Sequence, residues 1–254
     1  MRISIANQKG GVGKTTTCIN LAALVASRTG PCLILDLDPQ GNCSSGLGVD
    51  KAQLTLSSYH LMAGQAEPDA CIVSTGVKNL DIIPSTTDLA ATEIELASEE
   101  NRALRLKEVL EKLRKPYKYI FVDCPPSLGL LTINALVASD ALLIPVQTEF
   151  YALEGLSQLM ETYQSVKASY NSELRINGLL LTMSDVRTQL AKQVESELRR
   201  YYDTLVYQTV IPRNVRLSEA PSYAKPIHLY DRLSKGARAY GKLCKEFLKR
   251  AKEA

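Results

Sequence analysis

The stretch QKGGVGKT, residues 8–15, constrains the fold of this chain more than any other part of it. It lies between a short apolar, strand-like segment and a longer segment of helical period. Gly10, Gly11 and Gly13 allow backbone angles that other residues resist, so successive N–H groups can converge on phosphate oxygens where a helix begins. The stretch therefore predicts a phosphate-binding loop within a strand–loop–helix unit.

This loop differs from the phosphate-binding pattern G-x-x-x-x-G-K-[ST] at its start. Gln8 stands where the first glycine would be, and Lys9 adds a second lysine. The rest follows the pattern, because Lys14 can reach the β- and γ-phosphates of a nucleotide and the Thr15 hydroxyl can bind Mg²⁺. We therefore expect a nucleotide and magnesium to bind here, and the second lysine raises the question of its own role.

Short apolar runs alternate with segments of helical period along the whole chain. The expected strands are residues 3–7, 32–38, 80–84, 119–125, 141–146, 176–183 and 205–211, and the expected helices include 15–27, 102–114, 153–170, 189–201 and 234–252. Such alternation predicts an α/β fold with a doubly wound, mainly parallel sheet and helices on both faces. With no repeat or linker-like tract, we expect one domain over residues 1–254.

Composition and cysteine spacing exclude several classes of protein. No run approaches the roughly 20 apolar residues of a membrane-spanning helix, and the N-terminus does not read as a secretory signal, so we expect a cytoplasmic protein. The six cysteines form no C-x-x-C pair or Cys/His cluster. This spacing argues against a structural zinc site and a disulfide framework, and favours reduced, buried thiols.

Charge is distributed unevenly along the chain. Residues 187–253 hold 15 Lys/Arg against 7 Asp/Glu, whereas residues 1–186 hold 15 against 20. A basic final quarter indicates either a surface for a polyanion or a solvated, lysine-rich helix. The last helical segment has apolar residues at helical spacing, which suits packing against the sheet or, alternatively, lying on a membrane surface.

Carboxylates follow two of the expected strands. Asp36 and Asp38 end the second strand, and Asp123 follows the apolar run YIFV. Ligands of parallel sheets bind beyond the carboxyl ends of the strands, where the glycine-rich loop also lies. Asp123 is suited to hold the hydration shell of Mg²⁺, and Asp38 is the better candidate for orienting an attacking water.

Six motifs resemble those of the ParA/Soj chromosome- and plasmid-partitioning ATPases. That family belongs to the deviant Walker A class of P-loop NTPases, with MinD and the nitrogenase iron protein. The first motif identifies the class, and the later ones are more specific to the ParA/Soj branch. The motifs are NQKGGVGKTTT, LDLDPQGN, FVDCPPSLG, IPVQTEFYALEGL, LLTMSDVRTQLA and VIPRNVRLSEAPSYAKPI, which run through nearly the whole chain.

The resemblance implies a role for each residue of the site. Lys9 resembles the signature lysine that reaches across an ATP-bound homodimer to the partner's phosphates, which would make it catalytic together with Lys14 and Asp38. Asp36 and Asp123 resemble the acids around Mg²⁺, with Thr15 as a ligand. The expected nucleotide-binding residues are Lys9, Gly10, Gly11, Val12, Gly13, Lys14, Thr15, Thr16, Pro212 and Arg213, the last two in the loop that borders the adenine.

The resemblance also implies partners. ATP-bound dimers of this family bind double-stranded DNA without sequence preference, and Arg187 and Arg216 occupy the matching places here. Surface lysines such as Lys192, Lys235 and Lys242 are either further DNA contacts or solvated charges. A ParB/Spo0J-like protein is the expected stimulator of slow ATP hydrolysis. A nucleoid-associated protein without stable membrane association follows from this resemblance.

Other functions fit the same loop. A MinD-like membrane-positioning ATPase would need an amphipathic C-terminal helix that is free to bind lipid. An iron-protein-like redox enzyme would need cysteines placed to bridge a cluster, and Cys124 has no second cysteine in a comparable position. A small-molecule ligase is the third alternative. Because the first strand begins near residue 2, we expect no N-terminal helix-turn-helix extension of the plasmid ParA type.

Overall fold

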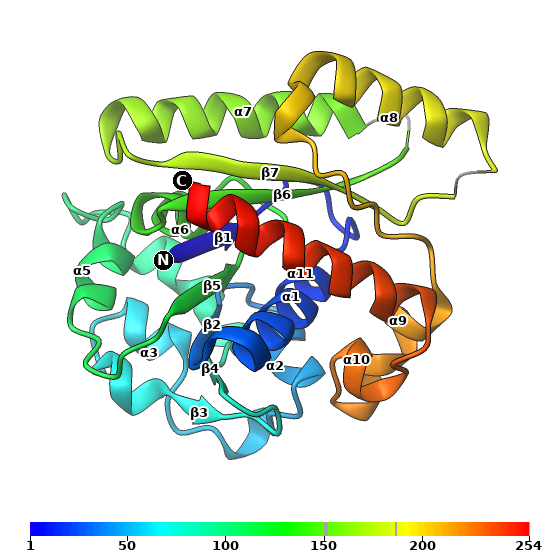
Figure 1. Cartoon of the computed structure of the whole chain (residues 1–254). Helices are drawn as coiled ribbons and strands as arrows, with labels where there is room; N and C mark the ends of the chain where they lie inside the picture. Colours follow the sequence, from blue (N-terminus) through cyan, green and yellow to red (C-terminus); the bar gives the residue numbers. More distant parts are fainter. Residues whose placement is uncertain (150–151, 186, 254) are drawn as a thin grey trace.

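The computed structural model of the chain describes residues 1–149, 152–185 and 187–253. The strands are β1 (Arg2–Ile5), β2 (Cys32–Asp36), β3 (Val73–Ser74), β4 (Leu80–Ile83), β5 (Tyr119–Asp123), β6 (Ala141–Gln147) and β7 (Arg175–Thr182). Within the described residues they form one sheet in the order β3-β4-β2-β5-β1-β6-β7 (Figure 1). All neighbouring pairs are parallel except β3 with β4, which confirms the predicted mainly parallel sheet.

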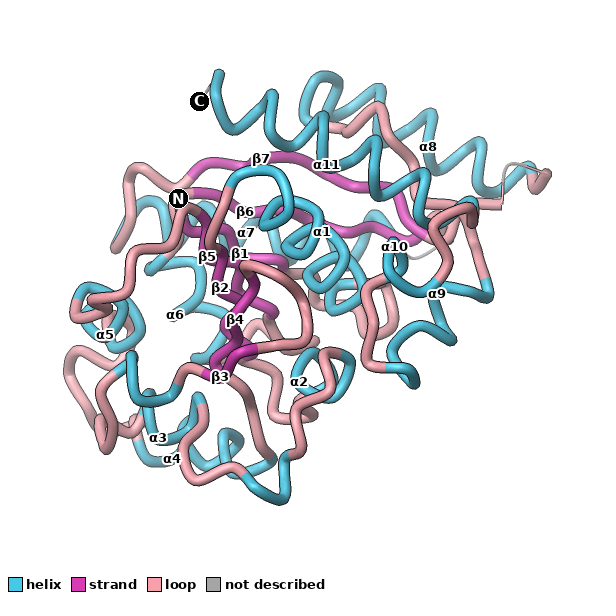
Figure 2. Tube along the Cα trace, turned by 60° about the horizontal axis from the view of Figure 1, so that its bottom comes forward, coloured by secondary structure: helices cyan, strands magenta, loops and turns pink. Residues whose placement is uncertain are grey.

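Helices connect the strands. They are α1 (Lys14–Thr29), α2 (Asn42–Gly46), α3 (Ser58–Met62), α4 (Thr92–Glu95), α5 (Arg105–Glu111), α6 (Leu130–Ala138), α7 (Ala152–Ser169), α8 (Gln189–Tyr202), α9 (Val215–Glu219), α10 (Ile227–Tyr230) and α11 (Lys235–Glu253). Short 3₁₀ turns add to these. Figure 2 shows the strands running through the middle of the molecule with helices on both sides, so the doubly wound α/β fold expected from the sequence is confirmed.

Both faces of the sheet are buried. Residues of α3, α5, α6, α7 and α8 form one apolar core, and residues of α1, α2, α10 and α11 form the other. Because successive side chains of a strand point to opposite faces, a strand in the middle of the sheet can serve both cores. In β2, Leu33 and Leu35 belong to the first core, while Cys32 and Ile34 belong to the second. This double burial explains why the strands are nearly continuous apolar runs.

The apolar side of α11 lies inside the second core. Tyr240, Leu243 and Phe247 are 0–1% exposed. The ring of Phe247 contacts Phe121 of β5 at a centroid distance of 5.7 Å, and the Tyr240 hydroxyl lies 3.2 Å from that of Thr17 on α1. The sequence left two alternatives for this helix, packing against the sheet or lying on a membrane surface. The structure shows the first, with α11 packed in the fold next to α1 (Figure 1).

The strand predicted at residues 205–211 is wrong. The segment touches β7 at separated points, for example where the Tyr207 amide donates to the Leu179 carbonyl at 2.9 Å. Between these points the Gln208 amide and the next amide along the chain donate to the Glu246 carboxylate of α11, at 2.8 and 2.9 Å. A carboxylate from a distant helix thus binds two successive amides, of which that of Thr209 would otherwise have extended the ladder.

Two further elements differ from expectation. The helix predicted over residues 102–114 is shorter, because its start is held from another helix: Asn134 of α6 accepts from the Leu106 amide at 3.0 Å and donates to the Arg102 carbonyl at 2.8 Å. Strand β3 was not predicted, since two residues carry no readable alternation.

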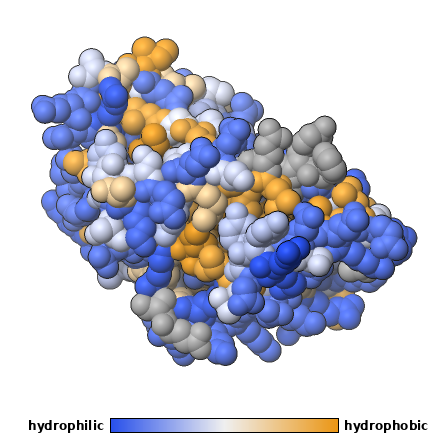
Figure 3. All heavy atoms as spheres, turned by 90° about the horizontal axis from the view of Figure 1, so that it is seen from above, coloured by the Kyte–Doolittle hydropathy of each residue, from blue (hydrophilic) through white to orange (hydrophobic). Residues whose placement is uncertain are grey.

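The state of the cysteines and the polarity of the surface agree with what the composition predicts. All six cysteines are buried and free, as predicted. Among the described residues, no helix is both long enough and apolar enough to cross a membrane. From the side of α7 and α8 the surface is mostly hydrophilic, with separate hydrophobic patches between the polar side chains (Figure 3).

Candidate functional site

The glycine-rich loop leaves the middle of the sheet, because β1 lies between β5 and β6. Gly11 and Gly13 have φ values of +74° and +87°, in the left-handed region that favours glycine. Gly13 is the N-cap of α1, and Lys14 is its first residue. The loop therefore turns its backbone at the positively polarised start of a sixteen-residue helix, where a phosphate group is stabilised.

Hydrogen bonds to two strands anchor this loop. Asn7 donates to the Pro145 carbonyl of β6 at 2.7 Å and accepts from the Lys9 amide at 3.0 Å. On the other side, the Thr182 hydroxyl of β7 donates to the Val12 carbonyl at 2.8 Å. The loop is thus tied to the two strands beyond β1, which fixes its backbone before any ligand is bound.

The two lysines of the loop have different surroundings. Lys14 is 6% exposed and donates to the Lys9 carbonyl at 3.1 Å. Burial lowers the pKa of Lys14, and the negative charge of Asp123 opposes this shift. The Lys9 ammonium instead points outward and pairs with Glu149 at 2.8 Å, with both side chains partly exposed. Exposed ion pairs contribute little, so Lys9 can exchange this partner at small cost.

Two predicted metal-site acids lie side by side behind the loop. Asp36 and Asp123 are directly paired in the parallel register of β2 and β5, and both are 0% exposed. The Ser44 amide and hydroxyl donate to one Asp36 oxygen at 2.9 and 2.7 Å, and the Asp38 amide donates to the other at 3.2 Å. Burial raises the pKa of Asp36 to about 6, which the Ser44 hydrogen bonds oppose.

The Asp123 carboxylate lacks comparable hydrogen bonds from the described residues. Neither of its oxygens has a hydrogen bond of good geometry from a described residue, although the Thr15 hydroxyl is near enough to lower its pKa. Burial dominates and raises the pKa of Asp123 well above its usual value, and Asp36 raises it further. Two buried, orphaned carboxylate oxygens fit a cation or its hydration shell, which would complete this site.

Magnesium fits this arrangement with help from a ligand. The described residues hold no group of three or more His, Cys, Asp or Glu side chains that could bind a metal alone. Mg²⁺ is commonly held by one or two protein oxygens together with phosphates and water. The Thr15 hydroxyl and the Asp123 carboxylate would supply the protein oxygens, and the remaining ligands would come from a nucleotide and solvent.

Replacing Asp123 with asparagine should stabilise the ligand-free chain by about 1–3 kcal/mol near pH 8, because the wild type must either bury this charge without hydrogen bonds or bind a proton to neutralise it. A carboxyl whose pKa is raised by folding is destabilising above its unfolded pKa, so the gain should grow as the pH rises from about 4. Urea unfolding in EDTA at several pH values measures it. A lower free energy of unfolding for the variant at every pH would contradict the assignment.

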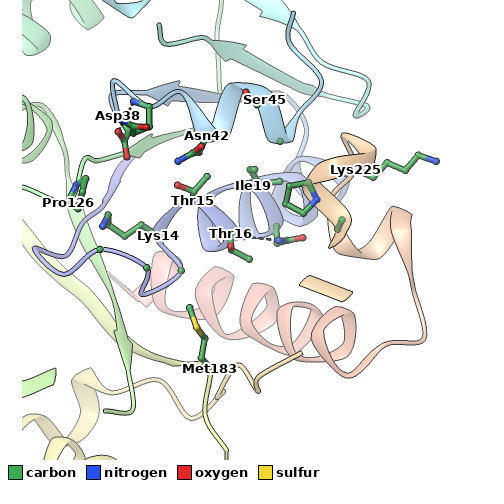
Figure 4. Close-up of a pocket in the computed structure, with 18 residues that line it drawn as sticks. Lys14, Thr15, Thr16, Ile19, Asp38, Asn42, Ser45, Pro126, Met183 and Lys225 are labelled. Carbon is green, nitrogen blue, oxygen red and sulfur yellow. Dashed lines mark hydrogen bonds between the residues drawn. The ribbon is translucent and has the colours of Figure 1, made fainter. Parts of the chain in front are cut away.

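Asp38 lies beyond the end of β2, on the wall of a cavity that borders the glycine-rich loop. Its Oδ1 accepts from the Gln40 amide at 2.9 Å, and the residue is 7% exposed. Figure 4 shows Asp38, Asn42 and Thr15 on one side of the loop cavity, Met183 across the loop from them, and Lys225 extending away. Asp38 is thus held by its own loop while it borders the space in front of the phosphate-binding backbone.

Two cavities meet at the loop. The first, of about 510 Å³, is lined by Gly10, Gly11, Gly13, Lys14, Thr15, Thr16, Asp38 and residues of α1, α2 and the loop before α10. The second, of about 520 Å³, is lined by Pro212 and Arg213. The two share Gly13, Thr16, Met183 and Pro221. The sequence motifs contain Met183 and Pro221, but only the tertiary structure shows that both border the site.

The two arginines predicted for DNA binding are exposed and paired with acids. Arg187 makes two bonds to the Asp185 carboxylate, at 2.8 and 2.6 Å, with its side chain 86% exposed. Arg216 on α9 pairs with Glu219 at 2.8 Å and approaches Asp231 at 3.6 Å. Such exposed pairs are weak, so a phosphate can compete for both guanidinium groups.

The exposed side of α11 carries a stripe of cations that the sequence analysis named only in part. Its members recur at intervals of three and four residues, which places them on one face. They are Lys235, Arg238, Lys242, Lys245 and Lys249. The stripe spans about 20 Å at the helical rise. A cavity of about 490 Å³ joins its first half to Ser184 and Pro212, and Ser184 accepts from the Arg213 amide at 3.2 Å.

Sequence comparisons find a family model and curated relatives that match most of this chain. A family model described as an AAA domain matches residues 1–176. The chain is 55% identical over 244 residues to the sporulation initiation inhibitor protein Soj of Bacillus subtilis (strain 168), covering 96% of each. It is 50% identical over 248 residues to the chromosome partitioning protein ParA of Myxococcus xanthus (strain DK1622), covering 98% of this chain and 88% of that protein.

The fold is also found among solved structures. A crystal structure of cobyrinic acid a,c-diamide synthase from Mycobacterium smegmatis with bound ADP and magnesium superimposes with a TM-score of 0.87. Its sequence is 34% identical, and the match covers 99% of this chain and 95% of that one. A protein that shares the architecture described above therefore holds a nucleotide and a magnesium ion.

Proposed function

Because the chain belongs to the ParA/Soj family of chromosome-partitioning ATPases, we propose that it is an ATP-dependent dimeric switch that binds DNA without sequence preference. The observation that carries the nucleotide part is the anchored glycine loop with Asp36 and Asp123 behind it at the same edge of the sheet. Phosphates would rest on the loop backbone and the start of α1, in the first cavity.

The residues around this cavity have different roles in the proposed hydrolysis of ATP. Lys14 leaves the Lys9 carbonyl and binds the β- and γ-phosphates, where its buried charge is strongly attracted. Bound magnesium supplies charge neutralisation at the phosphates, and Thr15, Asp36 and Asp123 are the residues that would hold it and its water shell. Asp38 positions the attacking water, because it borders the cavity and is fixed by the Gln40 amide.

Lys9 supports the dimeric form of the switch. Lys9 does not line the cavity of its own chain, and among the described residues its ammonium pairs with the partly exposed Glu149. It is therefore available to the phosphates of a second copy, as the family resemblance implies. A lysine that must come from a partner links ATP binding to homodimer formation, and release of phosphate would weaken the dimer again.

The cationic surface supports the DNA part of the proposal. Arg187, Arg216 and the stripe on α11 lie outside the nucleotide site, and each arginine has a weak partner that a phosphate can replace. Contacts of this kind release counterions and read no bases, so binding should be salt-sensitive and indifferent to sequence. This surface fits a nucleoid-associated protein whose hydrolysis is stimulated by a ParB/Spo0J-like partner.

The alternatives fit less well. A MinD-like membrane role would need the apolar side of α11, but Tyr240, Leu243 and Phe247 are used in the core. A ligase role is suggested by the name of the solved structure at 34% identity, whereas the curated relatives at 55% and 50% are the Soj and ParA proteins above. Vesicle pelleting and a product assay distinguish these functions from DNA binding.

The test is co-sedimentation with DNA in the nucleotide-free, ADP and ATP states at about 50 and 200 mM salt. With ATP, the wild type should bind any sequence and lose at least about tenfold affinity across this salt range. The double variant Arg187→Glu/Arg216→Glu should lose about 100-fold, because two phosphate contacts become repulsive. Lys242→Glu/Lys245→Glu should weaken binding in the same way through the stripe.

Controls separate DNA binding from the nucleotide switch. Arg114→Glu reverses an exposed charge on the connection between α5 and β5 and should bind DNA like the wild type. Light scattering with ATP should show dimers for every surface variant. A wild-type ATP dimer that fails to bind DNA would refute the DNA part and leave the ATPase part intact.

A further inference from the structure

Asp38 begins a tight turn over residues 38–41. The Gly41 amide donates to the Asp38 carbonyl at 2.8 Å, and Pro39 stands second in the turn, where its fixed backbone angle is favoured. The Gln40 amide donates to the Asp38 carboxylate at 2.9 Å. The direction of this carboxylate therefore depends on how the peptide groups on either side of Gln40 are held.

Lys51 holds this turn from a separate segment of the chain. It is the first residue of a 3₁₀ turn, Lys51–Gln53, and its ammonium donates to the Gln40 carbonyl at 2.8 Å. The peptide group after Gln40 is thus bonded at both ends, at its oxygen by Lys51 and through its nitrogen to Asp38. Rotation of this peptide group would break both hydrogen bonds, one of which involves a charged donor.

The turn is closely packed where Lys51 meets it. Gly41 has a φ of +59°, and a Cβ placed on it would lie 2.7 Å from the Lys51 ammonium and 2.6 Å from the Ser85 carbonyl. The Ser85 amide donates to the Ser44 hydroxyl at 3.0 Å, and that hydroxyl donates to Asp36. Lys51 and a hydrogen-bonded chain that leads to Asp36 therefore meet at this glycine.

We infer that Lys51 is a positioning residue for ATP hydrolysis, which fixes the direction of the Asp38 carboxylate through the Gln40 carbonyl. Asp38 and Gln40 line the nucleotide cavity and Lys51 does not, so the lysine acts through the turn. A carboxylate that orients water must be held to within about 0.5 Å, because a small misplacement lowers the rate of the reaction. This inference rests on the proposed ATPase function and adds the residue that prepares Asp38 for it.

The test is steady-state ATP hydrolysis by the full chain, measured as phosphate release. Lys51→Met keeps an unbranched side chain but has no ammonium, and it should lower kcat about 10-fold with KM changed by less than about twofold. Lys51→Arg still offers donors to the carbonyl and should keep most of the wild-type rate. Lys78→Met, at an exposed lysine in the turn between β3 and β4, is the matched control and should behave as the wild type.

A double variant shows whether Lys51 acts through Asp38. In the Asp38→Ala background, Lys51→Met should change the rate by less than about twofold, because the group that it positions is already gone. A further loss of about 10-fold in that background would overturn the inference, since coupled residues do not give additive effects. Wild-type turnover in Lys51→Met, or a KM that rises as kcat falls, would overturn it as well.

These outcomes are distinct from failure of the proposed function. If Lys51→Met hydrolyses ATP as the wild type does, the inference falls and the ATPase stands. If the wild type neither binds nor hydrolyses ATP, the proposed function itself fails. Thermal unfolding without nucleotide shows whether each variant is folded, and recovery of the rate in Lys51→Arg separates loss of the ammonium from general damage to the turn.

Discussion

Lys14→Ala should abolish nucleotide binding and lower ATP hydrolysis by about 1,000-fold. The ammonium lies at the start of α1, nearly fully buried, and its ligand-free partner is the carbonyl of Lys9. A charge-assisted contact to phosphate in a shielded site is among the strongest that a side chain makes, so its loss costs both binding and transition-state stabilisation. The ligand-free fold should be unaffected, because burial already disfavours this charge.

Thermal or urea unfolding with and without ADP measures the effect directly. At 100 times its dissociation constant, a ligand stabilises the native state by about 2.7 kcal/mol, and this gain should vanish in Lys14→Ala. Lys78→Ala removes an exposed lysine from the turn between β3 and β4 and should keep the full gain. A Lys14→Ala protein that is still stabilised by ADP would show that the phosphates bind elsewhere.

Asp38→Ala should reduce ATP hydrolysis at least about 100-fold and leave ATP binding nearly unchanged. The carboxylate lies on the cavity wall, beyond the strand that carries Asp36. Its loss removes the group that we propose orients water but none of the loop that we propose holds the phosphates, and orientation alone is worth several powers of ten in rate. The variant should therefore accumulate the ATP-bound dimer.

Lys9→Ala gives the opposite pattern and serves as the contrasting variant. Without the lysine that we propose reaches a second copy, ATP should bind to monomers, and light scattering should show no dimer. Asp88→Ala, at an exposed acid before α4, is the matched control and should hydrolyse ATP at the wild-type rate. Wild-type turnover in Asp38→Ala, measured as phosphate release, would remove Asp38 from the mechanism.

Much of the site could be predicted because its residues lie at strand ends within short motifs. Gly11, Gly13, Lys14 and Thr15 carry their geometry in the local chain, since glycine angles and a helix start need no distant partner. The alternation of apolar runs with helices likewise predicts the sheet, because burial on both faces leaves its mark on each strand separately. These features depend on the local sequence, and they can therefore be predicted from it.

The sequence alone determined the fold class, the phosphate loop and the candidate acids, since each follows from residue type and spacing. The tertiary structure alone decided which distant groups meet. The register of β2 and β5 pairs Asp36 with Asp123, Glu246 takes an amide that would otherwise have extended a ladder over residues 205–211, and Lys51 holds the turn that follows β2. The physical reason is that hydrogen bonds and desolvation depend on neighbours in space, which the order of residues along a chain does not reveal.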